Sequence, residues 1–296
     1  FQLVFLSWKI SAYLRLMLKT RFTAILLLII SIVFSVLGQS PLHDTDWKNT
    51  TVYQIYPRSF YDADGDGIGD LNGIIQKLDY IKDLGFESIW ISPFFSSPQE
   101  DFGYDISDYR SIASEYGDME TCLRLINEVH ERDMKIVFDL VMNHTSDQHS
   151  WFKESASSKD NSKADWYVWK DGTGRDGKKP PNNWNATIGG SGWHYHEGRN
   201  QFYWASFLGF QPDLNYHNAQ VRKEMLLTTK FWLGKGVDGF RLDIFNSIYE
   251  DTSFQNNPSS LRIVPSEENP DGFFQKMKYN VNQEGSFRFA TELRAV

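Results

Sequence analysis

The stretch GVDGFRLDIFN, residues 236–246, places an arginine and an aspartate one residue apart within a run of apolar side chains. Residues i and i+2 of a β-strand point to the same face, so Arg241 and Asp243 are expected to project together. A buried strand ordinarily avoids such charges, because an ionised group in an apolar interior must be paired. The pair therefore indicates either an ion pair that satisfies the end of a buried sheet or a functional site.

Strand-like and helix-like segments alternate along the chain on both sides of this stretch. Apolar, β-branched or aromatic runs predict five strands, at 51–57, 86–93, 134–143, 237–244 and 287–296. Apolar residues at helical spacing predict helices between them, at 73–85, 118–133 and 219–236. Such alternation predicts a parallel sheet, either doubly wound or closed into a β/α barrel.

Polar residues gather at the carboxyl ends of the predicted strands, which favours the barrel. In a β/α barrel this face carries the active site, and the residues concerned are Asn143, His144, Arg241, Asp243 and Glu292. No GxGxxG follows the first predicted strand, which disfavours a dinucleotide-binding fold. The fold class is thus predicted to be α/β, a (β/α)8 TIM barrel. Because a barrel needs eight strands and five are predicted, we expect the N-terminal part of a longer protein.

The alternation is interrupted between residues 144 and 215, which are rich in Trp, Gly and Asn and contain the turn-like stretches PPNNWN and GGSGWHYHEG. Several tryptophans there need a surface to pack on, so this segment is predicted to be a folded excursion. The predicted organisation is upstream residues with a signal peptide at 1–38, strands one to three at 39–143, the excursion at 144–215, and strands four and five at 216–296.

The amino-acid composition indicates a globular protein and argues against several kinds of partner and site. With 41% hydrophobic and 16% aromatic residues the chain is globular rather than disordered. A net charge of −8 and a pI near 5.4 argue against a nucleic-acid partner, which requires basic surfaces. The single cysteine, Cys122, excludes an internal disulfide and a cysteine-rich metal site.

The N-terminal region has the layout of a secretory signal. Lys19 and Arg21 precede an apolar run at 24–37, and small and polar residues follow it. The run is shorter than the ~20 residues that a spanning helix needs, so an uncleaved membrane anchor is the alternative. We therefore expect a secreted protein, extracellular or periplasmic, without a membrane contact after cleavage. The sequons at Asn49 and Asn185 could then be glycosylated in a eukaryote.

Two carboxylates lie at the ends of the last two predicted strands. Asp243 and Glu292 at neighbouring strand ends could lie roughly 5–5.5 Å apart, the separation found in retaining glycosidases. One would act as nucleophile and the other, with a raised pKa, as proton donor. Arg241 would lower the pKa of Asp243 and keep it ionised. Glu284 is a rival for the proton donor, but it precedes the last predicted strand rather than following it.

The loop DADGDGIGD, residues 62–70, alternates carboxylates with glycines in the manner of an oxygen-only cation site suited to calcium. The ligand atoms would come from Asp62, Asp64, Asp66 and Asp70 and from the Ile68 carbonyl. The EF-hand pattern is incomplete because no glutamate stands at the twelfth position. The alternative is a solvated acidic turn.

Taken alone, Asp105 and His144 are more often structural hydrogen-bonding residues than ligand contacts.

Four segments together resemble the α-amylase family of glycoside hydrolases: DADGDGIGDL, DLVMNHTS, QPDLN and GFRLDI. Within it they resemble the oligo-1,6-glucosidase and maltase branch, and the match runs from about residue 46 to the end. The resemblance implies a β/α barrel with an excursion, domain B, after strand three. It also implies a retaining α-glucosidase that hydrolyses short oligosaccharides or disaccharides from the non-reducing end.

The same resemblance implies roles for individual residues. Asp243 would be the nucleophile, with Arg241 as its partner. Glu292 would be the proton donor, an assignment that rests on a shorter motif. The glucose in the first subsite would contact Tyr104, Asp105 and His144. The loop at 62–70 would hold a structural Ca²⁺ or Mg²⁺.

The chain departs from the family pattern in two places. The third catalytic aspartate, near strand seven, and the small β domain after the barrel have no counterpart, so the full-length protein is expected to be active and this chain alone inactive. Ile244, after the nucleophile, favours 1,6 linkages. One alternative is a sugar-transferring relative that forms isomaltulose or trehalose. Another is a non-catalytic ectodomain of a type II membrane protein such as an amino-acid-transporter heavy chain, although that class tends to lack the carboxylates present here.

Overall fold

The computed structural model describes residues 47–264 and 271–296. The predicted signal segment lies outside the described residues. Thr51–Val296 form one compact unit, and the description below concerns this unit. Within the described ranges, the structure contains no helix with the length and apolar character needed to cross a membrane.

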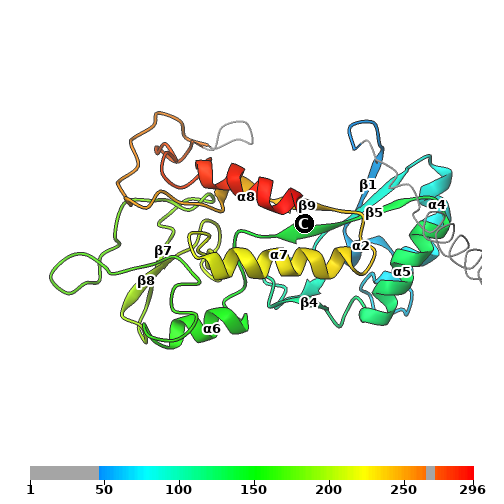
Figure 1. The fold of residues 1–296 in the computed structure, drawn as a ribbon, viewed down its shortest axis with the longest axis horizontal. Coiled ribbons are helices and arrows are strands. Elements are labelled where there is room, and N and C mark those ends of the chain that lie inside the picture. Colours follow the sequence, from blue (N-terminus) through cyan, green and yellow to red (C-terminus); the bar gives the residue numbers. More distant parts are fainter. Residues whose placement is uncertain (1–46, 265–270) are drawn as a thin grey trace, which may run out of the picture. The chain divides into compact units, whose positions relative to one another are not determined.

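A four-stranded parallel sheet forms the centre of the unit (Figure 1). Its strands follow chain order, with β1 (Val52–Ile55) beside β2 (Ser88–Ile91), then β5 (Lys135–Val141) and β9 (Gly239–Asp243). This is the arrangement of the first four strands of a β/α barrel. The four predicted strands that contain these segments are therefore confirmed.

Helices connect the parallel strands, as a parallel sheet requires. They are α2 (Pro57–Phe60), α3 (Leu71–Gln76), α4 (Leu78–Asp83), α5 (Met119–Glu131) and α7 (Ala219–Leu233). The short 3₁₀ helix η1 (Phe245–Ser247) and α8 (Glu284–Arg294) follow β9. In α5 the buried residues Cys122, Leu125, Ile126 and Val129 recur at helical spacing. The Asp118 carboxylate caps this helix by accepting the Thr121 N–H at 2.8 Å.

The predicted helix at 73–85 is observed as two short helices, α3 and α4, which share Lys77 as their cap. Lys77 has φ −106° and ψ 3°, outside the helical region. The apolar spacing continues across this break, because Ile74, Leu78 and Ile81 are all fully buried. Gly85 follows α4 with φ 88°, the left-handed conformation that favours glycine after a helix.

Two antiparallel sheets are inserted between the parallel strands. The strands β3 (Phe95–Ser96) and β4 (Asp108–Ile112) form a hairpin after β2, which the sequence pattern did not predict. Later in the chain, β6 (Trp169–Lys170), β8 (Gln201–Trp204) and β7 (Trp193–His196) form a three-stranded sheet in that order. The buried side chains of Trp184, Trp193, Phe202 and Trp204 make a second hydrophobic core there.

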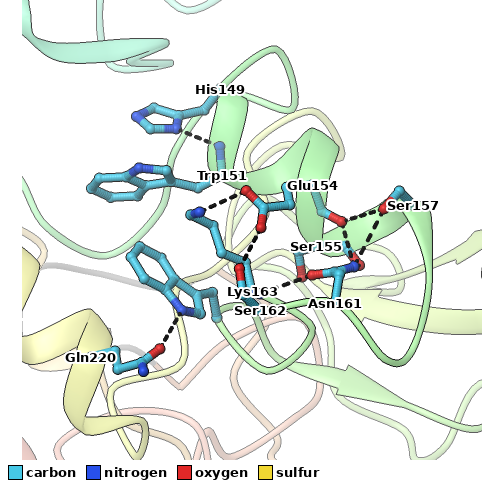
Figure 2. A network of polar contacts seen from close by, with 10 residues as sticks. His149, Trp151, Glu154, Ser155, Ser157, Asn161, Ser162, Lys163 and Gln220 are labelled. Atoms are coloured by element: carbon cyan, nitrogen blue, oxygen red, sulfur yellow. Dashed lines mark hydrogen bonds and ion pairs between the residues drawn. The ribbon is translucent and has the colours of Figure 1, made fainter.

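Helix α6 (Ser150–Ser157) and the loop after it are tied together by the polar network in Figure 2. Glu154 accepts a hydrogen bond from the Ser162 hydroxyl at 2.6 Å and pairs with Lys163 at 2.6 Å. The Trp166 indole N–H then donates to Gln220 of α7 at 3.2 Å. The network therefore fixes the start of the inserted segment against a helix of the parallel sheet.

The predicted strand at 287–296 is wrong, because Glu284–Arg294 form helix α8. The alternation of Phe287, Arg288 and Phe289 suggested a strand, but Phe289 is fully buried whereas Phe287 is 67% exposed. Residues 285, 286 and 289 form the buried face at helical spacing. The helix lies beside α7 (Figure 1), where Arg222 of α7 pairs with Glu292 at 3.9 Å.

Candidate active site

The register of the parallel sheet brings three charged side chains together. Asp139 of β5 lies opposite Arg241 of β9, and Val141 lies opposite Asp243. In-register neighbours project to the same face, and so do residues two apart in one strand. Arg241 Nη1 accordingly contacts both carboxylate oxygens of Asp139 at 3.2 Å and also forms a short ion pair with Asp243. One guanidinium group therefore links two carboxylates at the carboxyl end of the sheet.

Burial changes the electrostatics that we expected for Asp243. Its pKa is raised because burial disfavours the charged form, although Arg241 acts in the opposite direction. Arg241 does lower the pKa of Asp243, but burial raises that pKa by more, so the net shift is upward. The desolvation of a side chain that is only 11% exposed outweighs the ion pair.

Two aromatic residues complete this group. The Trp90 indole N–H of β2 donates to Asp139 Oδ2 at 3.2 Å, and the Arg241 guanidinium lies over the Trp90 ring at 5.1 Å from its centroid. The Tyr104 hydroxyl donates to the same Asp139 oxygen over a longer distance, 3.5 Å. Burial raises the pKa of Tyr104, so its hydroxyl remains a donor at neutral pH.

His144 is buried just after β5 and stays neutral. Burial lowers its pKa to about 4, so the imidazole is uncharged at neutral pH. Its Nδ1 lies 3.3 Å from the Asn143 amide nitrogen, whereas its Nε2 has no hydrogen-bond partner among the described residues. A buried polar atom without a partner requires an explanation. A hydroxyl group of a bound sugar would satisfy this nitrogen.

Asp105 occupies a different polar pocket in the loop between β3 and β4. Its fully buried carboxylate accepts hydrogen bonds from the Ser97 hydroxyl at 2.8 Å and from the N–H groups of Glu100 and Asp101 at 3.0 Å and 3.2 Å. These donors hold the loop around Asp105. A sugar hydroxyl would have to use the remaining acceptor capacity of the carboxylate.

The structure does not place Glu292 at the end of a strand. It lies in the last turn of α8, its side chain is 48% exposed, and its ion pair is with Arg222. The physical basis for its assignment as proton donor is therefore removed, because that basis was a strand next to β9. Its rival Glu284 is the first residue of the same helix and pairs with Arg288 at 3.7 Å.

Ile244 marks the end of β9 and has φ 37° and ψ 38°, in the left-handed region. A β-branched residue in that region is strained by roughly 1–3 kcal/mol. The conformation turns the chain from β9 into η1 directly after Asp243. Ile244 is thus placed at the rim of the site by a backbone turn rather than by strand alternation.

The loop at 62–70 brings carboxylates together on its inner side. Oxygen atoms of Asp62, Asp64 and Asp70 lie within 4.8 Å of one another. Backbone N–H groups also bind these side chains, and those of Gly65 and Gly67 lower the pKa of Asp62. Gly65 and Gly67 have positive φ values that allow the tight curvature. An all-oxygen set of ligands in this geometry fits a hard cation such as Ca²⁺.

A second set of buried oxygen atoms could not be found from the sequence. Glu250 is 2% exposed, and both of its carboxylate oxygens lack a hydrogen-bond partner among the described residues. The Oδ1 atom of buried Asn143 is likewise unpartnered. The charge of fully buried Asp213 raises the pKa of Glu250 further, after the larger effect of burial. We call Asn143, Asp213 and Glu250 the buried oxygen cluster.

The buried oxygen cluster contains two carboxylates in an interior that water does not reach. Two carboxylates close together in a dry interior repel each other unless a proton or a cation lies between them. Burial raises the pKa of Asp213 to about 7, while Ser206 and Asn143 lower it. Glu250 also lines a cavity of about 260 Å³, together with His217, Asn215 and Tyr167 among others.

Comparison with known proteins places this geometry in context. The family model described as alpha amylase, catalytic domain, matches residues 54–296. The oligo-1,6-glucosidase of Bacillus cereus is 48% identical over 247 residues, which is 83% of this chain and 42% of that protein. The chain thus spans less than half the length of this curated relative.

Solved structures agree with the parallel sheet. The α-glucosyl transfer enzyme XgtA matches with a TM-score of 0.80 and 45% identity, over 84% of this chain and 47% of that chain. The isomaltulose synthase SmuA from Protaminobacter rubrum matches with a TM-score of 0.69 and 50% identity, over 71% and 37%. Together with the family match, these likenesses confirm the predicted β/α barrel, of which the described residues contribute four parallel strands.

Proposed function

The chain belongs to the α-amylase family, and we propose that it forms the nucleophile-bearing part of a retaining α-glucosidase. The observation that supports this proposal is the group at the carboxyl end of β9, where Arg241 pairs with both Asp243 and Asp139. The substrates are short oligosaccharides or disaccharides, which the enzyme hydrolyses from the non-reducing end. Relatives named as glucosidases support this class of substrate.

In the proposed reaction Asp243 attacks the anomeric carbon of the glucose unit. A bond forms from its carboxylate oxygen to that carbon while the bond to the leaving oxygen breaks, and the leaving oxygen takes a proton. Water then releases glucose and restores the carboxylate. Arg241 keeps Asp243 oriented, and the unpartnered Nε2 of His144 binds a hydroxyl of the glucose.

The proton donor is assigned to a part of the enzyme that this chain does not span, since Glu292 lies on an exposed part of α8. The share of its relatives that the chain covers, 42% and 47%, supports this assignment. We use "the complete enzyme" for this chain continued to the length of its relatives. The test is glucose release from p-nitrophenyl α-glucoside by the chain and by the complete enzyme. Release by the complete enzyme alone is expected, and no release by a folded complete enzyme would contradict the function.

Transfer of glucose to a second sugar is the other candidate reaction. The names of two structural relatives, an α-glucosyl transfer enzyme and an isomaltulose synthase, favour it. Both reactions share the glycosyl–enzyme intermediate and differ in whether water or a sugar accepts the glucose. Product analysis with sucrose separates them, because hydrolysis yields glucose and fructose in equal amounts whereas transfer keeps the glucose bound in an isomeric disaccharide or a longer oligosaccharide.

We propose that the loop at 62–70 binds Ca²⁺ or Mg²⁺ as a structural ion. Replacing Asp64 with asparagine is expected to reduce the rise in melting temperature that Ca²⁺ causes, because a ligand of the native state alone stabilises it. Scanning fluorimetry with and without Ca²⁺ measures this change in the complete enzyme. Asp118→Asn is the matched control, since it removes one exposed acidic charge while asparagine still caps α5. An equal response to Ca²⁺ in both variants would make the loop a plain acidic turn.

Secretion remains a proposal that rests on the sequence pattern at 17–38. Recovery of the mature N-terminus by sequencing the protein from its producing cell tests it. An N-terminus shortly after residue 38 is expected, and a protein that retains the apolar run would favour the anchored alternative.

A further inference from the structure

Phe102 is an exposed aromatic residue in a backbone conformation that does not suit it. It lies in a tight turn between β3 and β4, which the Tyr104 N–H closes by donating to the Asp101 carbonyl at 3.0 Å. Both central residues have positive φ, 52° at Phe102 and 97° at Gly103. Type I′ turns have this property and usually contain Asn-Gly. Glycine adopts the conformation freely, whereas phenylalanine is strained in it.

Burial does not compensate for this strain. The Phe102 side chain is 59% exposed. Its ring contacts Tyr56, the residue that follows β1, edge to face at 6.4 Å between centroids. A residue that suits neither the turn nor the core indicates a role other than stability. Phe274 shares the positive φ and the high exposure, so the position of Phe102 in the fold has to show what its role is.

The turn is anchored on both sides of Phe102. On one side the Asp101 carboxylate accepts a hydrogen bond from Gln211 Nε2 at 2.7 Å. On the other side the buried Asp105 carboxylate accepts three hydrogen bonds from side-chain and backbone groups of residues 97–101. The aromatic ring is therefore presented by a loop whose backbone is held in place.

The ends of this turn lie at the candidate site. Tyr104, its last residue, donates to Asp139 at 3.5 Å. Burial raises the pKa of Asp243, and the nearby charge of Asp101, the first residue of the turn, raises it further. Phe102 stands between these two residues of the turn. Its exposed ring is consequently placed at the edge of the site, where the site meets solvent.

The order of the sugar units decides what a ring at this edge can contact. An enzyme that acts from the non-reducing end holds the terminal glucose innermost, beside Asp243. The unit that leaves therefore lies at the mouth of the site. One face of a sugar ring carries C–H groups, and a large, flat aromatic side chain buries such a face well. An exposed phenylalanine at the edge of the site thus matches the second unit of the substrate.

We propose that Phe102 is a specificity residue: its ring stacks on the second sugar unit, so that the enzyme prefers glucosides whose leaving group is a sugar over those with a small leaving group. This inference rests on the proposed function, in which Asp243 attacks the terminal glucose. Phe102 has no polar group and takes no part in making or breaking bonds. Its effect therefore belongs mainly to the KM for the disaccharide.

The test replaces Phe102 with asparagine in the complete enzyme, which removes the ring and gives the turn the residue that it prefers. The readout is the ratio of two kcat/KM values. The first is for maltose or isomaltose, whichever the parent enzyme hydrolyses faster, and the second is for α-glucosyl fluoride, whose leaving group is a single atom. We expect the ratio to fall about tenfold, the scale of one lost aromatic contact. Phe102→Tyr should keep the parent ratio, because it retains an aromatic ring.

Melting curves separate this role from a structural one. Asparagine tolerates the left-handed conformation, so the melting temperature of Phe102→Asn should stay equal or rise. Tyr80→Asn is the matched control, because it removes a ring that is 53% exposed from α4 and should leave the ratio unchanged. An unchanged ratio in folded Phe102→Asn, or an equal fall in Tyr80→Asn, would overturn the proposal.

Binding gives a second readout that needs no turnover. In the Asp243→Asn variant, the further change Phe102→Asn should weaken maltose binding about tenfold, measured by calorimetry. Binding of deoxynojirimycin, a single-ring mimic of the terminal glucose, should change much less. An equal loss for both ligands would place Phe102 beside the terminal glucose and overturn its assignment to the second unit.

The two levels of inference fail separately. If Phe102→Asn keeps the parent ratio while Asp243→Asn is inactive, the role of Phe102 is wrong and the proposed function stands. If Asp243→Asn retains turnover, or the folded complete enzyme hydrolyses none of these substrates, the proposed function fails and the role of Phe102 falls with it.

Discussion

Replacing Asp243 with asparagine is expected to reduce turnover of α-glucosides by the complete enzyme by at least about 10³-fold, the scale on which removal of a nucleophile acts. Asparagine fits the space at the end of β9 but cannot form the ester bond to the anomeric carbon. Arg241 pairs with both Asp139 and Asp243, and the substitution removes its ion pair with Asp243. The loss is in kcat, and the binding of a substrate analogue should change much less.

Steady-state assays with p-nitrophenyl α-glucoside measure this effect, with melting curves to show that the variant is folded. Asp238→Asn serves as the control, because it removes a carboxylate that pairs with Lys135 of β5 at the opposite end of β5 and β9. Ordinary turnover in a folded Asp243→Asn variant would remove Asp243 from the nucleophile role. Equal losses in both variants would point to damaged folding instead.

Replacing Glu250 with glutamine is expected to have the largest effect on the response to Ca²⁺. In the buried oxygen cluster, Glu250 and Asp213 are two carboxylates in one dry site. Without a cation the substitution removes a repulsion, so the melting temperature should stay equal or rise. In a protein whose loop at 62–70 is disabled by Asp64→Asn, Ca²⁺ at about 100 times its Kd should stabilise the native state by about 2.7 kcal/mol, and the additional Glu250→Gln should abolish this gain.

This experiment is done in the Asp64→Asn variant, so that Ca²⁺ binding by the loop at 62–70 does not contribute to the melting temperature. Scanning fluorimetry then compares Asp64→Asn with the double variant Asp64→Asn, Glu250→Gln, each with and without Ca²⁺. A rise that persists in the double variant would contradict a cation at the buried oxygen cluster. The unpartnered oxygens of Glu250 and Asn143 would then have to be satisfied by buried water.

Local periodicity was enough to predict the strand that carries the site. Arg241 and Asp243 share a face because the side-chain period of a strand is two, a rule that needs no knowledge of the rest of the fold. The same rule applied to Phe287 and Phe289 predicted a strand and was wrong, since only Phe289 packs against the core. A short aromatic alternation does not say which of its members finds a buried neighbour.

Asp139 carried a signal that the sequence analysis did not use. A single carboxylate inside the apolar run VFDLV, residues 137–141, is costly unless it is paired. Its partners Trp90, Tyr104 and Arg241 are distant in sequence, so the pairing could be expected but the partners could not be named. The register of β5 against β9 supplies this information.

The buried oxygen cluster could not be predicted from the sequence. Glu250 lies in an unremarkable polar stretch after η1, and Asp213 and Asn143 come from separate segments. Only their burial and the unpartnered oxygens of Glu250 and Asn143 identify them as a group. The loop at 62–70 is the opposite case, because its carboxylates are close in sequence and their spacing alone predicts a cation site.

Covalent labelling of the nucleophile tests the central claim most directly. The complete enzyme is incubated with an activated fluoroglucoside, which forms the glycosyl–enzyme bond quickly and hydrolyses slowly, and the labelled peptide is then sequenced by mass spectrometry. We predict one glucosyl label per molecule on the peptide that contains Asp243, and none in Asp243→Asn. A label on a different carboxylate, or inhibition without any covalent label, would contradict the assignment of this strand end as the nucleophile site of a retaining α-glucosidase.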